Sequence, residues 1–391
     1  MHQPEPDDRP RVLHLTQPVD GGVARVVTDL ARAQLAAGLH ITVACPPSPL
    51  SDDLRALGAD VRHWAATRAP GPSLPGEVRR LGRLLDEVHP DLVHAHSAKA
   101  GLAGRLAVRG RIPTVFQPHA WSFEAVRGTT AALALKWERF GARWADRVVC
   151  VSEAERTTGD RVRIAGQWSV VPNGIDTERF HPAPVDTVRA SLLPLFSPAA
   201  PLVVCVGRLC RQKGQDVLLA AWADVERNVP GARLALVGDG PDGERLRARA
   251  PESVLFTGAV ADAVPWYQAA DLVVLPSRWE GMALAPLEAL ACGRPVVVTD
   301  VDGALESLPA ALASRCLVPA ENPAALAGAV AGLLLDPMLR EALGHQGRRH
   351  VLAAHDVRRT AKAVADVYRE LLTTTERARV APPECRESIH S

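Results

Sequence analysis

Short apolar runs alternate with amphipathic stretches along most of the chain. Short apolar runs of this kind are typical of buried strands. Between the runs, apolar residues recur every three or four positions, as at Val23, Val26, Val27 and Leu30, and predict helices with one buried face. The predicted strands cover 11–16, 41–45, 61–64, 91–96, 113–117 and 147–151, and further predicted helices cover 74–88, 98–108 and 133–144.

The alternation stops after residue 176 and resumes at residue 202. Residues 181–201 contain many prolines and little periodicity, so they predict the link between two domains. Predicted strands then follow at 202–206, 234–237, 254–256, 272–275 and 296–299, with helices between them and at 324–335 and 358–372. Short apolar strands that alternate with helices form parallel sheets covered on both faces.

The predicted fold class is therefore α/β, with two tandem doubly wound, Rossmann-like domains that face a cleft at the C-terminal ends of their strands. We place an N-terminal domain at 1–182 and a C-terminal domain at 183–391. The helix at about 356–372 is expected to pack back on the N-terminal domain, and the polar residues 374–391 are expected to be disordered.

Composition narrows the class of protein. The chain has 391 residues, 47% hydrophobic and 23% charged, which is enough for two buried cores. A formal net charge of +1 gives no reason to expect a nucleic-acid partner. The seven cysteines are scattered without a Cys-x-x-Cys pair, and the acidic, proline-rich start does not resemble a signal peptide. No apolar run approaches the roughly 20 residues that span a bilayer. We expect a cytoplasmic protein, with peripheral contact at the inner face of the membrane left open.

The stretch from Arg278 to Leu290 carries the densest candidate chemistry. It follows a predicted strand and leads into a helix that we expect to start at Pro286, with Glu288 in the first turn. Gly281 and the small residues near it leave backbone N–H groups free for an anion such as a diphosphate. Glu280 and Glu288 flank this anion site, and carboxylates accept hydrogen bonds from hydroxyls. Either glutamate alone would be an ordinary surface acid, but together they indicate a sugar–diphosphate–ribose ligand.

Two cations follow the first strand of the second predicted domain. Arg208 offers a forked donor and Lys213 a point charge, and both lie just before a helix. They could be solvated loop cations. Because lysine is rare in this chain, a lysine at a strand end favours a role in neutralising a diphosphate.

Two other motifs suggest different chemistries. Gly238, Gly240 and Gly243 form a G-x-G-x-x-G turn, which leaves a nicotinamide-dependent oxidoreductase as the alternative function. The turn follows the second strand of its domain and lacks the expected ribose-binding acid about 20 residues on. Asp300 and Asp302 have the D-x-D spacing of a metal site, but Arg208 and Lys213 make a metal redundant and Asp302 suits a turn. We expect no metal.

In the first half, His119 ends a predicted strand, where side chains of α/β folds face a ligand. A structural histidine is the simpler alternative. His94 and His96 alternate along one strand and so face one side, but they lack a third metal ligand. An acceptor-side role for His96 and Lys99, or plain packing, remains open. Gly21 and Gly22 would allow a ligand close to the backbone.

These pieces together resemble the retaining family-4 glycosyltransferases of GT-B architecture, possibly of the type that builds bacterial surface polysaccharides. They occur in the order typical of that family, from about residue 11 to residue 372. The matching segments are Gly21-Gly22-Val23, His119, 171–176, Gly207-Arg208-Leu209 with Lys213-Gly214, 237–241 and 280–289. This chain has His119-Ala120 where members commonly carry His-Gly, and Asp302-Gly303 where a glycine pair is frequent.

The resemblance implies a donor site in the C-terminal domain for a sugar linked to UDP or GDP. Arg208 and Lys213 would bind the diphosphate, Glu288 the ribose and Glu280 the sugar hydroxyls. Gly22 and His119 would contact the donor sugar. The phosphate-binding backbone would be that of Gly281, Met282, Ala283 and Leu284.

The implied activity is a metal-independent, retaining transfer of a sugar to a hydroxyl, with no cofactor. The acceptor would be a glycan, a lipid-linked sugar or a small molecule, as in the synthesis of surface polysaccharides, glycolipids or secondary metabolites. Glu280, His119, Arg208 and Lys213 are the expected catalytic residues.

Overall fold

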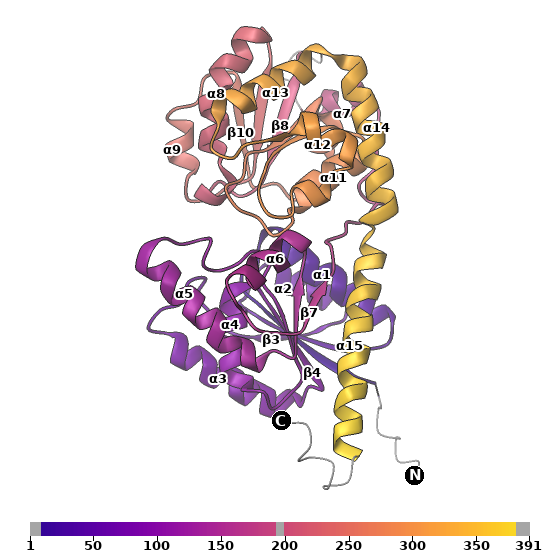
Figure 1. Ribbon diagram of the computed structural model, residues 1–391. Coiled ribbons are helices and arrows are strands. Elements are labelled where there is room, and N and C mark those ends of the chain that lie inside the picture. The colour runs from indigo at the N-terminus through magenta and orange to yellow at the C-terminus, as the bar shows by residue number, and fades with distance from the viewer. Residues whose placement is uncertain (1–8, 193–198, 381–391) are drawn as a thin grey trace. The chain divides into compact units, whose positions relative to one another are not determined.

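The structure is a computed structural model that describes residues 9–192 and 199–380. It contains two compact units, each built on a parallel β-sheet with helices packed on it (Figure 1). The first unit runs to Cys150 and adds Arg156–Val171 and the chain from Ala361 onward, and the second comprises Val151–Glu155 and Pro172–Thr360.

The sheet of the first unit has seven parallel strands in the order β3-β2-β1-β4-β5-β6-β7. Its central strands β1 and β4 are buried almost throughout, since helices cover both faces of a doubly wound sheet. The strands are β1 (Arg11–Thr16), β2 (His40–Cys45), β3 (Asp60–His63), β4 (Leu92–His96), β5 (Thr114–Gln117), β6 (Arg147–Cys150) and β7 (Trp168–Val170). The helices are α1 (Gly21–Ala36), α2 (Pro49–Ala56), α3 (Leu74–Val88), α4 (Ser97–Val108), α5 (Gly128–Gly141) and α6 (Glu153–Arg161).

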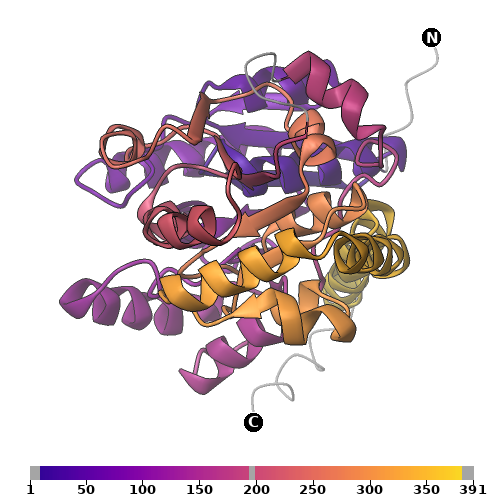
Figure 2. The same ribbon diagram turned by 90° about the horizontal axis from the view of Figure 1, so that it is seen from above.

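The sheet of the second unit has six parallel strands in the order β10-β9-β8-β11-β12-β13. They are β8 (Leu202–Val206), β9 (Arg233–Val237), β10 (Val254–Gly258), β11 (Leu272–Leu275), β12 (Val296–Thr299) and β13 (Leu317–Val318). The helices are α7 (Val185–Leu192), α8 (Gln215–Asn228), α9 (Gly243–Arg247), α10 (Val264–Ala269), α11 (Leu284–Ala291), α12 (Ala310–Cys316), α13 (Pro323–Leu335) and α14 (Pro337–Ala354). On one face α13, drawn in orange in Figure 2, packs against α8.

The strand order reverses between β8 and β11: β9 and β10 are added on one side of β8, whereas β11, β12 and β13 are added on the other, and all strands remain parallel. In such sheets the loops after the two central strands separate, and ligands bind between them. The predicted α/β class with doubly wound parallel sheets is confirmed.

The second unit begins earlier in the chain than residue 183, where the sequence suggests the domain change. The Asn173 side chain donates to the carbonyl oxygen of Met282 at 2.8 Å, and the Ile175 N–H donates to the carbonyl oxygen of His355 at 2.9 Å. The last helix, α15 (Val357–Val380), passes from the second unit to the first. There Tyr368 Oη lies 2.6 Å from His94 Nδ1.

Two local expectations fail. The proline-rich link at 181–201 contains helix α7, because Arg189 is buried and pairs with Asp271 at 2.7 Å, a contact that periodicity cannot show. Residues 374–380, expected to be disordered, continue helix α15, since helical hydrogen bonds need no apolar stripe to extend a helix already anchored by packing. Residues 381–391 of the same expectation lie outside the described residues.

Candidate functional site

Glu280 is held by several side chains of the second unit. Its Oε1 accepts hydrogen bonds from Lys213 Nζ at 2.6 Å and from Ser277 Oγ at 2.7 Å. Its side chain is only 10% exposed, whereas that of Lys213 is 20% exposed. Lys213 follows β8 and Glu280 follows β11, so the strand reversal brings the two predicted site residues together. Glu280 Oε2 has one long contact, to Gln212 Nε2 at 3.5 Å, and is the oxygen left for a ligand.

Helix α11 places backbone donors beside Glu280. It begins at Leu284, with Ala283 as an N-cap residue whose side chain makes no capping hydrogen bond. The expected start at Pro286 is wrong, because the turn before the proline is already helical and Pro286 has no N–H that the helix would need from it. An uncapped helix start is an anion-binding group, and its residues are those that the sequence analysis named, Met282, Ala283 and Leu284.

Glu288 lies in the second turn of α11, not the first, and points into the unit. Its Oε2 accepts a hydrogen bond from Tyr267 Oη at 2.6 Å, and Glu288 as a whole is 9% exposed. Burial raises the pKa of Tyr267 far above its usual value, and the neighbouring carboxylate adds to this, so the phenol stays a proton donor. The phenol therefore holds one oxygen of Glu288 in place.

Glycines bring these loops close enough to share a site. A Cβ on Gly214, next to Lys213, would lie 2.0 Å from the carbonyl oxygen of Pro276 at the end of β11. A Cβ on Gly303 would lie 1.9 Å from the carbonyl oxygen of Gly281, and the φ of Gly303 is +73°. The loops after β8, β11 and β12 thus contact each other through backbone atoms.

The remaining predicted cation, Arg208, differs from Lys213 in its contacts. Within residues 9–192 and 199–380, its guanidinium makes no ion pair, and only its carbonyl oxygen is used, by Gln215 Nε2 at 3.1 Å. Arg278, by contrast, pairs with both oxygens of Asp216 at 2.8 and 2.9 Å and fixes the loop before Glu280 to helix α8. Arg208 is the cation that remains for an anion.

The glycine turn that suggested a redox cofactor has a packing role. A Cβ on Gly238 would lie 2.2 Å from the carbonyl oxygen of Gly207, and one on Gly240 would lie 2.3 Å from that of Leu209. The Leu209 N–H also donates to the Asp239 carbonyl at 3.0 Å. Gly238, Gly240 and Gly243 therefore let this turn support the loop that carries Arg208. The oxidoreductase alternative is not supported.

Asp300 and Asp302 do not gather a metal set. Asp300 is exposed, and in the part of the chain that the structure describes neither residue joins a third histidine, cysteine or acid within ligand distance.

In the first unit, Gly22 lies in the first turn of α1 and is exposed. His119 follows β5, has φ +56° and is partly exposed, and the next residue, Ala120, has φ +98°. Both values are uncommon for residues with a Cβ.

The two acceptor-side candidates are buried. Lys99 Nζ pairs with Glu77 Oε2 at 2.6 Å, with side chains 2% and 0% exposed. A direct contact of Lys99 with an acceptor would require this pair to break. His96 is fully buried and contacts His119, with 3.2 Å between His96 Nδ1 and His119 Nε2.

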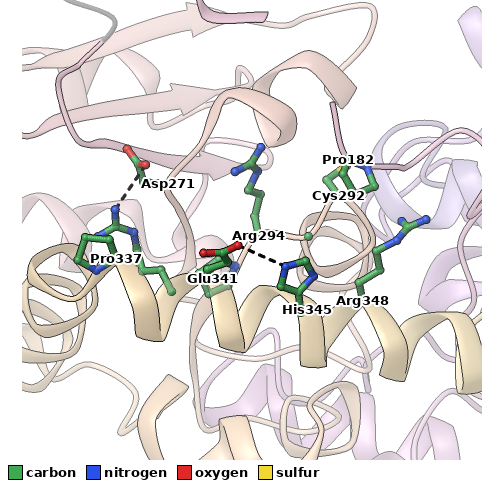
Figure 3. A pocket seen from close by; sticks show the side chains of 11 residues that line it. Pro182, Asp271, Cys292, Arg294, Pro337, Glu341, His345 and Arg348 are labelled. Atoms are coloured by element: carbon green, nitrogen blue, oxygen red, sulfur yellow. Dashed lines mark ion pairs between the residues drawn. The ribbon is translucent and has the colours of Figure 1, made fainter. Parts of the chain in front are cut away.

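A separate pocket of about 360 Å³ lies at the other end of α11, beside α14 (Figure 3). Two of its arginines donate hydrogen bonds to backbone carbonyl oxygens: Arg294 to that of Gln268 at 2.8 Å and Arg340 to that of Leu333 at 3.0 Å. The pocket contains none of the predicted donor-site residues.

Sequence patterns missed several residues of the site. Tyr267 contacts Glu288 and Gln212 contacts Glu280 because separate elements meet, whereas Ser277 contacts Glu280 from three residues earlier in the same loop. Arg278 begins the stretch that the sequence singles out, but its contact with Asp216 could not be read from that stretch.

Two protein-family models match this chain, one in each half. Residues 20–179 match the model for Glycosyltransferase Family 4, and residues 200–336 match that for Glycosyl transferases group 1. A GDP-mannose-dependent alpha-(1-6)-phosphatidylinositol monomannoside mannosyltransferase of Mycobacterium tuberculosis is 31% identical over 388 residues, which is 92% of this chain and 98% of that protein. This chain belongs to the family-4 glycosyltransferases.

Solved structures share the fold of this chain. Sucrose-phosphate synthase from Thermosynechococcus elongatus superimposes with a TM-score of 0.79 at 25% identity, covering 94% of this chain and all of that one. Anabaena HepE, solved with UDP and glucose, gives 0.78 at 24% identity over 93% of this chain and all of that one. The fold is GT-B, and the activity of this family-4 protein is sugar transfer from a nucleotide-sugar donor.

Proposed function

We propose that this glycosyltransferase transfers a hexose from a UDP- or GDP-linked donor with retention of anomeric configuration and without a metal ion. The observation that carries the proposal is the grouping of Lys213, Glu280 and the uncapped start of α11 at the reversal point of the second sheet. The mannosyltransferase relative is named for GDP-mannose, and HepE was solved with UDP and glucose, so both nucleotides are candidates.

In the proposed reaction, Arg208 and Lys213 neutralise the diphosphate as it leaves, which is the role that a metal has in other transferases. The amides at Ala283 and Leu284 bind the same phosphates. The bond between the sugar C1 and the phosphate oxygen breaks, and its electron pair goes to the diphosphate. A bond from C1 to the acceptor oxygen forms on the same face of the sugar, and the hydroxyl proton passes to the departing phosphate oxygen.

The two glutamates bind hydroxyls in this proposal. Glu288, held by Tyr267, accepts from the ribose, and Glu280 accepts from the donor sugar through Oε2. His119 and Gly22 of the first unit contribute further donor-sugar contacts. Lys213 contacts Glu280 at present and would be shared with the diphosphate once the donor binds.

We also propose that the protein acts on the cytoplasmic side, with peripheral contact to the membrane. In support, the six described cysteines are free and buried, and burial raises the pKa of Cys45 to about 11 and that of Cys205 to about 12. None of the helices in the described ranges has the length and apolar character that crossing a bilayer requires. The acceptor class remains a glycan, a lipid-linked sugar or a small molecule.

A donor panel tests the proposal. Purified protein would be incubated with UDP- and GDP-hexoses and candidate acceptors, and the released nucleotide measured with and without EDTA. We expect release with one donor, full activity in EDTA, and a product whose anomeric proton coupling in NMR matches that of the donor. Inverted product, or loss in EDTA that manganese restores, would contradict the retaining or the metal-independent part respectively.

A further inference from the structure

A chain of side-chain hydrogen bonds runs through the core of the first unit to His119. Gln34 Oε1, on helix α1, lies 2.7 Å from His14 Nε2 on β1. His14 Nδ1 lies 2.9 Å from His96 Nε2 on β4. His96 Nδ1 lies 3.2 Å from His119 Nε2. Gln34, His14 and His96 are at most 3% exposed, so water does not compete for these contacts.

The histidines in this chain are neutral. Burial lowers the pKa of His14 to about 4 and that of His119 to about 3. Burial and the neighbouring His94, His14 and His119 keep the pKa of His96 far below its usual value. A neutral imidazole has one N–H donor and one acceptor nitrogen. A ring that donates from one nitrogen must therefore accept at the other.

The direction is set at Gln34. Its Oε1 can only accept, so His14 carries its hydrogen on Nε2 and offers Nδ1 as an acceptor. His96 must then donate from Nε2 to His14 and accept at Nδ1. His119 must in turn donate from Nε2 to His96, which leaves His119 Nδ1 without a hydrogen.

We propose that Gln34, His14 and His96 are positioning residues that hold His119 in the Nε2–H tautomer, with Nδ1 as its free acceptor. The functional part of this inference rests on the proposed contact of His119 with the donor sugar. With Nδ1 free, His119 accepts a hydrogen bond from a sugar hydroxyl and does not donate a proton to it. In this assignment Gln34, on helix α1, determines that His119 Nδ1 is an acceptor and not a donor.

A metal ion is the competing explanation for the same cluster. Among described residues, His14, His94 and His96 each offer a nitrogen, all within 4.8 Å of one another. His94 Nε2 has no hydrogen-bond partner there. However, the 2.9 Å contact uses the facing nitrogens of His14 and His96 in one hydrogen bond. The chain therefore explains these two residues without an ion.

Nitrogen NMR on the full-length protein tests the tautomers without any substrate. Histidine labelled with ¹⁵N would be recorded at neutral pH, and signals assigned by single histidine substitutions. We expect His14, His96 and His119 all as Nε2–H tautomers. An Nδ1–H tautomer or an imidazolium at any of the three would overturn the inference, as would stoichiometric zinc by elemental analysis.

Kinetics test the consequence for the donor site. Gln34→Leu removes the terminal acceptor, and we expect a mixture of His119 tautomers and a drop in kcat/KM for the donor of about threefold to tenfold, the effect of one neutral hydrogen bond. Gln117→Leu is the matched control. Gln117, on β5, is buried and pairs with His96 of β4, but it is not a member of the hydrogen-bond chain from Gln34 to His119. An equal drop in both variants would overturn the positioning role.

A second pair of variants distinguishes a change of tautomer from a loss of packing. His96→Gln keeps one donor and one acceptor, whereas His96→Leu keeps neither. We expect the glutamine variant to retain the His119 tautomer and to lose less activity than the leucine variant. Identical losses would argue against the chain. Because the NMR arm uses no donor, a failure of the proposed sugar contact would show only in the kinetics.

Discussion

At the scale of single residues, the proposed donor site depends on side chains whose hydrogen bonds are already made. Oε1 of Glu280 is occupied by Lys213 and Ser277, and one oxygen of Glu288 by Tyr267. One oxygen of each glutamate is thus fixed, and Oε2 of Glu280 has only the 3.5 Å contact with Gln212. Such preorganisation lowers the cost of ordering the site when the donor binds.

We predict that Glu280→Gln keeps the fold and lowers kcat/KM for the donor about tenfold to hundredfold, since loss of a charged hydrogen bond is worth about 1.5–3 kcal/mol. The remaining carbonyl oxygen can still accept from Lys213 and Ser277. Steady-state kinetics with the true donor check this. Glu321→Gln is the control, because Glu321 pairs with Arg278 and its side chain is 57% exposed. Unchanged kinetics in Glu280→Gln would rule out its role.

Ala120 offers a stability prediction. Its φ of +98° is strained for a residue with a Cβ, at a cost of roughly 1–3 kcal/mol. Glycine removes that strain but loses more entropy on folding, by roughly 0.5–1 kcal/mol. Ala120→Gly should therefore raise the free energy of unfolding by about 1 kcal/mol. Ala132→Gly, exposed inside helix α5, should lower it, and denaturant melts of both would decide. Parallel losses would refute strain at Ala120.

At the scale of elements, helix α5 has an unusual surface. Leu133 is 68% exposed and Phe140 is 45% exposed, and they lie seven residues apart on one side of the helix. Arg143 lies over the Phe140 ring at 4.1 Å, and Lys136 and Arg139 are exposed beside it. Apolar side chains interleaved with cations suit the surface of an anionic bilayer.

We predict that Leu133→Ser with Phe140→Ser weakens binding to anionic vesicles about tenfold or more, because each apolar side chain contributes about 1 kcal/mol or more when buried in lipid. Vesicle sedimentation at low and physiological salt measures this. Met338→Ser is the control, an apolar side chain 75% exposed on the second unit. If wild-type protein does not sediment with anionic vesicles, the proposed membrane contact fails.

At the scale of the whole molecule, the proposed donor ligands are divided between two units. Arg208, Lys213, Glu280 and Glu288 belong to the second unit, whereas Gly22 and His119 belong to the first. The second unit contains a complete sheet with its own reversal point. It therefore holds every residue proposed to bind the nucleotide diphosphate.

We predict that residues 172–360, expressed alone, bind UDP or GDP weakly and transfer no sugar. Starting at residue 172 keeps the Asn173 contact with Met282 and the Ile175 contact with His355. Circular dichroism would first establish folding, and calorimetry would then measure binding, with Arg208→Ala as a non-binding control. A folded unit that binds neither UDP, GDP nor ADP would contradict a donor site in the second unit.

The sequence was sufficient for the elements whose signal is local. Apolar runs located the central strands of both sheets, since strands buried on both faces must be apolar. The periodicity of 74–88 matched helix α3 at both ends. The sequence did not predict helix α7, which depends on an ion pair with a distant residue. It did not predict the C-terminal extension of α15 either, because that extension continues a helix already formed.

The sequence alone also predicted the types of group at the proposed donor site: two cations, two carboxylates and a helix start preceded by Gly281, in a fixed order. Only the tertiary structure decided which of them meet. The strand reversal between β8 and β11 joins Lys213 to Glu280, and close backbone contacts at Gly214 and Gly303 draw their loops together. The histidine chain behind His119 was equally hidden, because His14 and His96 are 82 residues apart and become neighbours only through the pairing of β1 with β4. Local propensity acts over a few residues, whereas these contacts depend on sheet order.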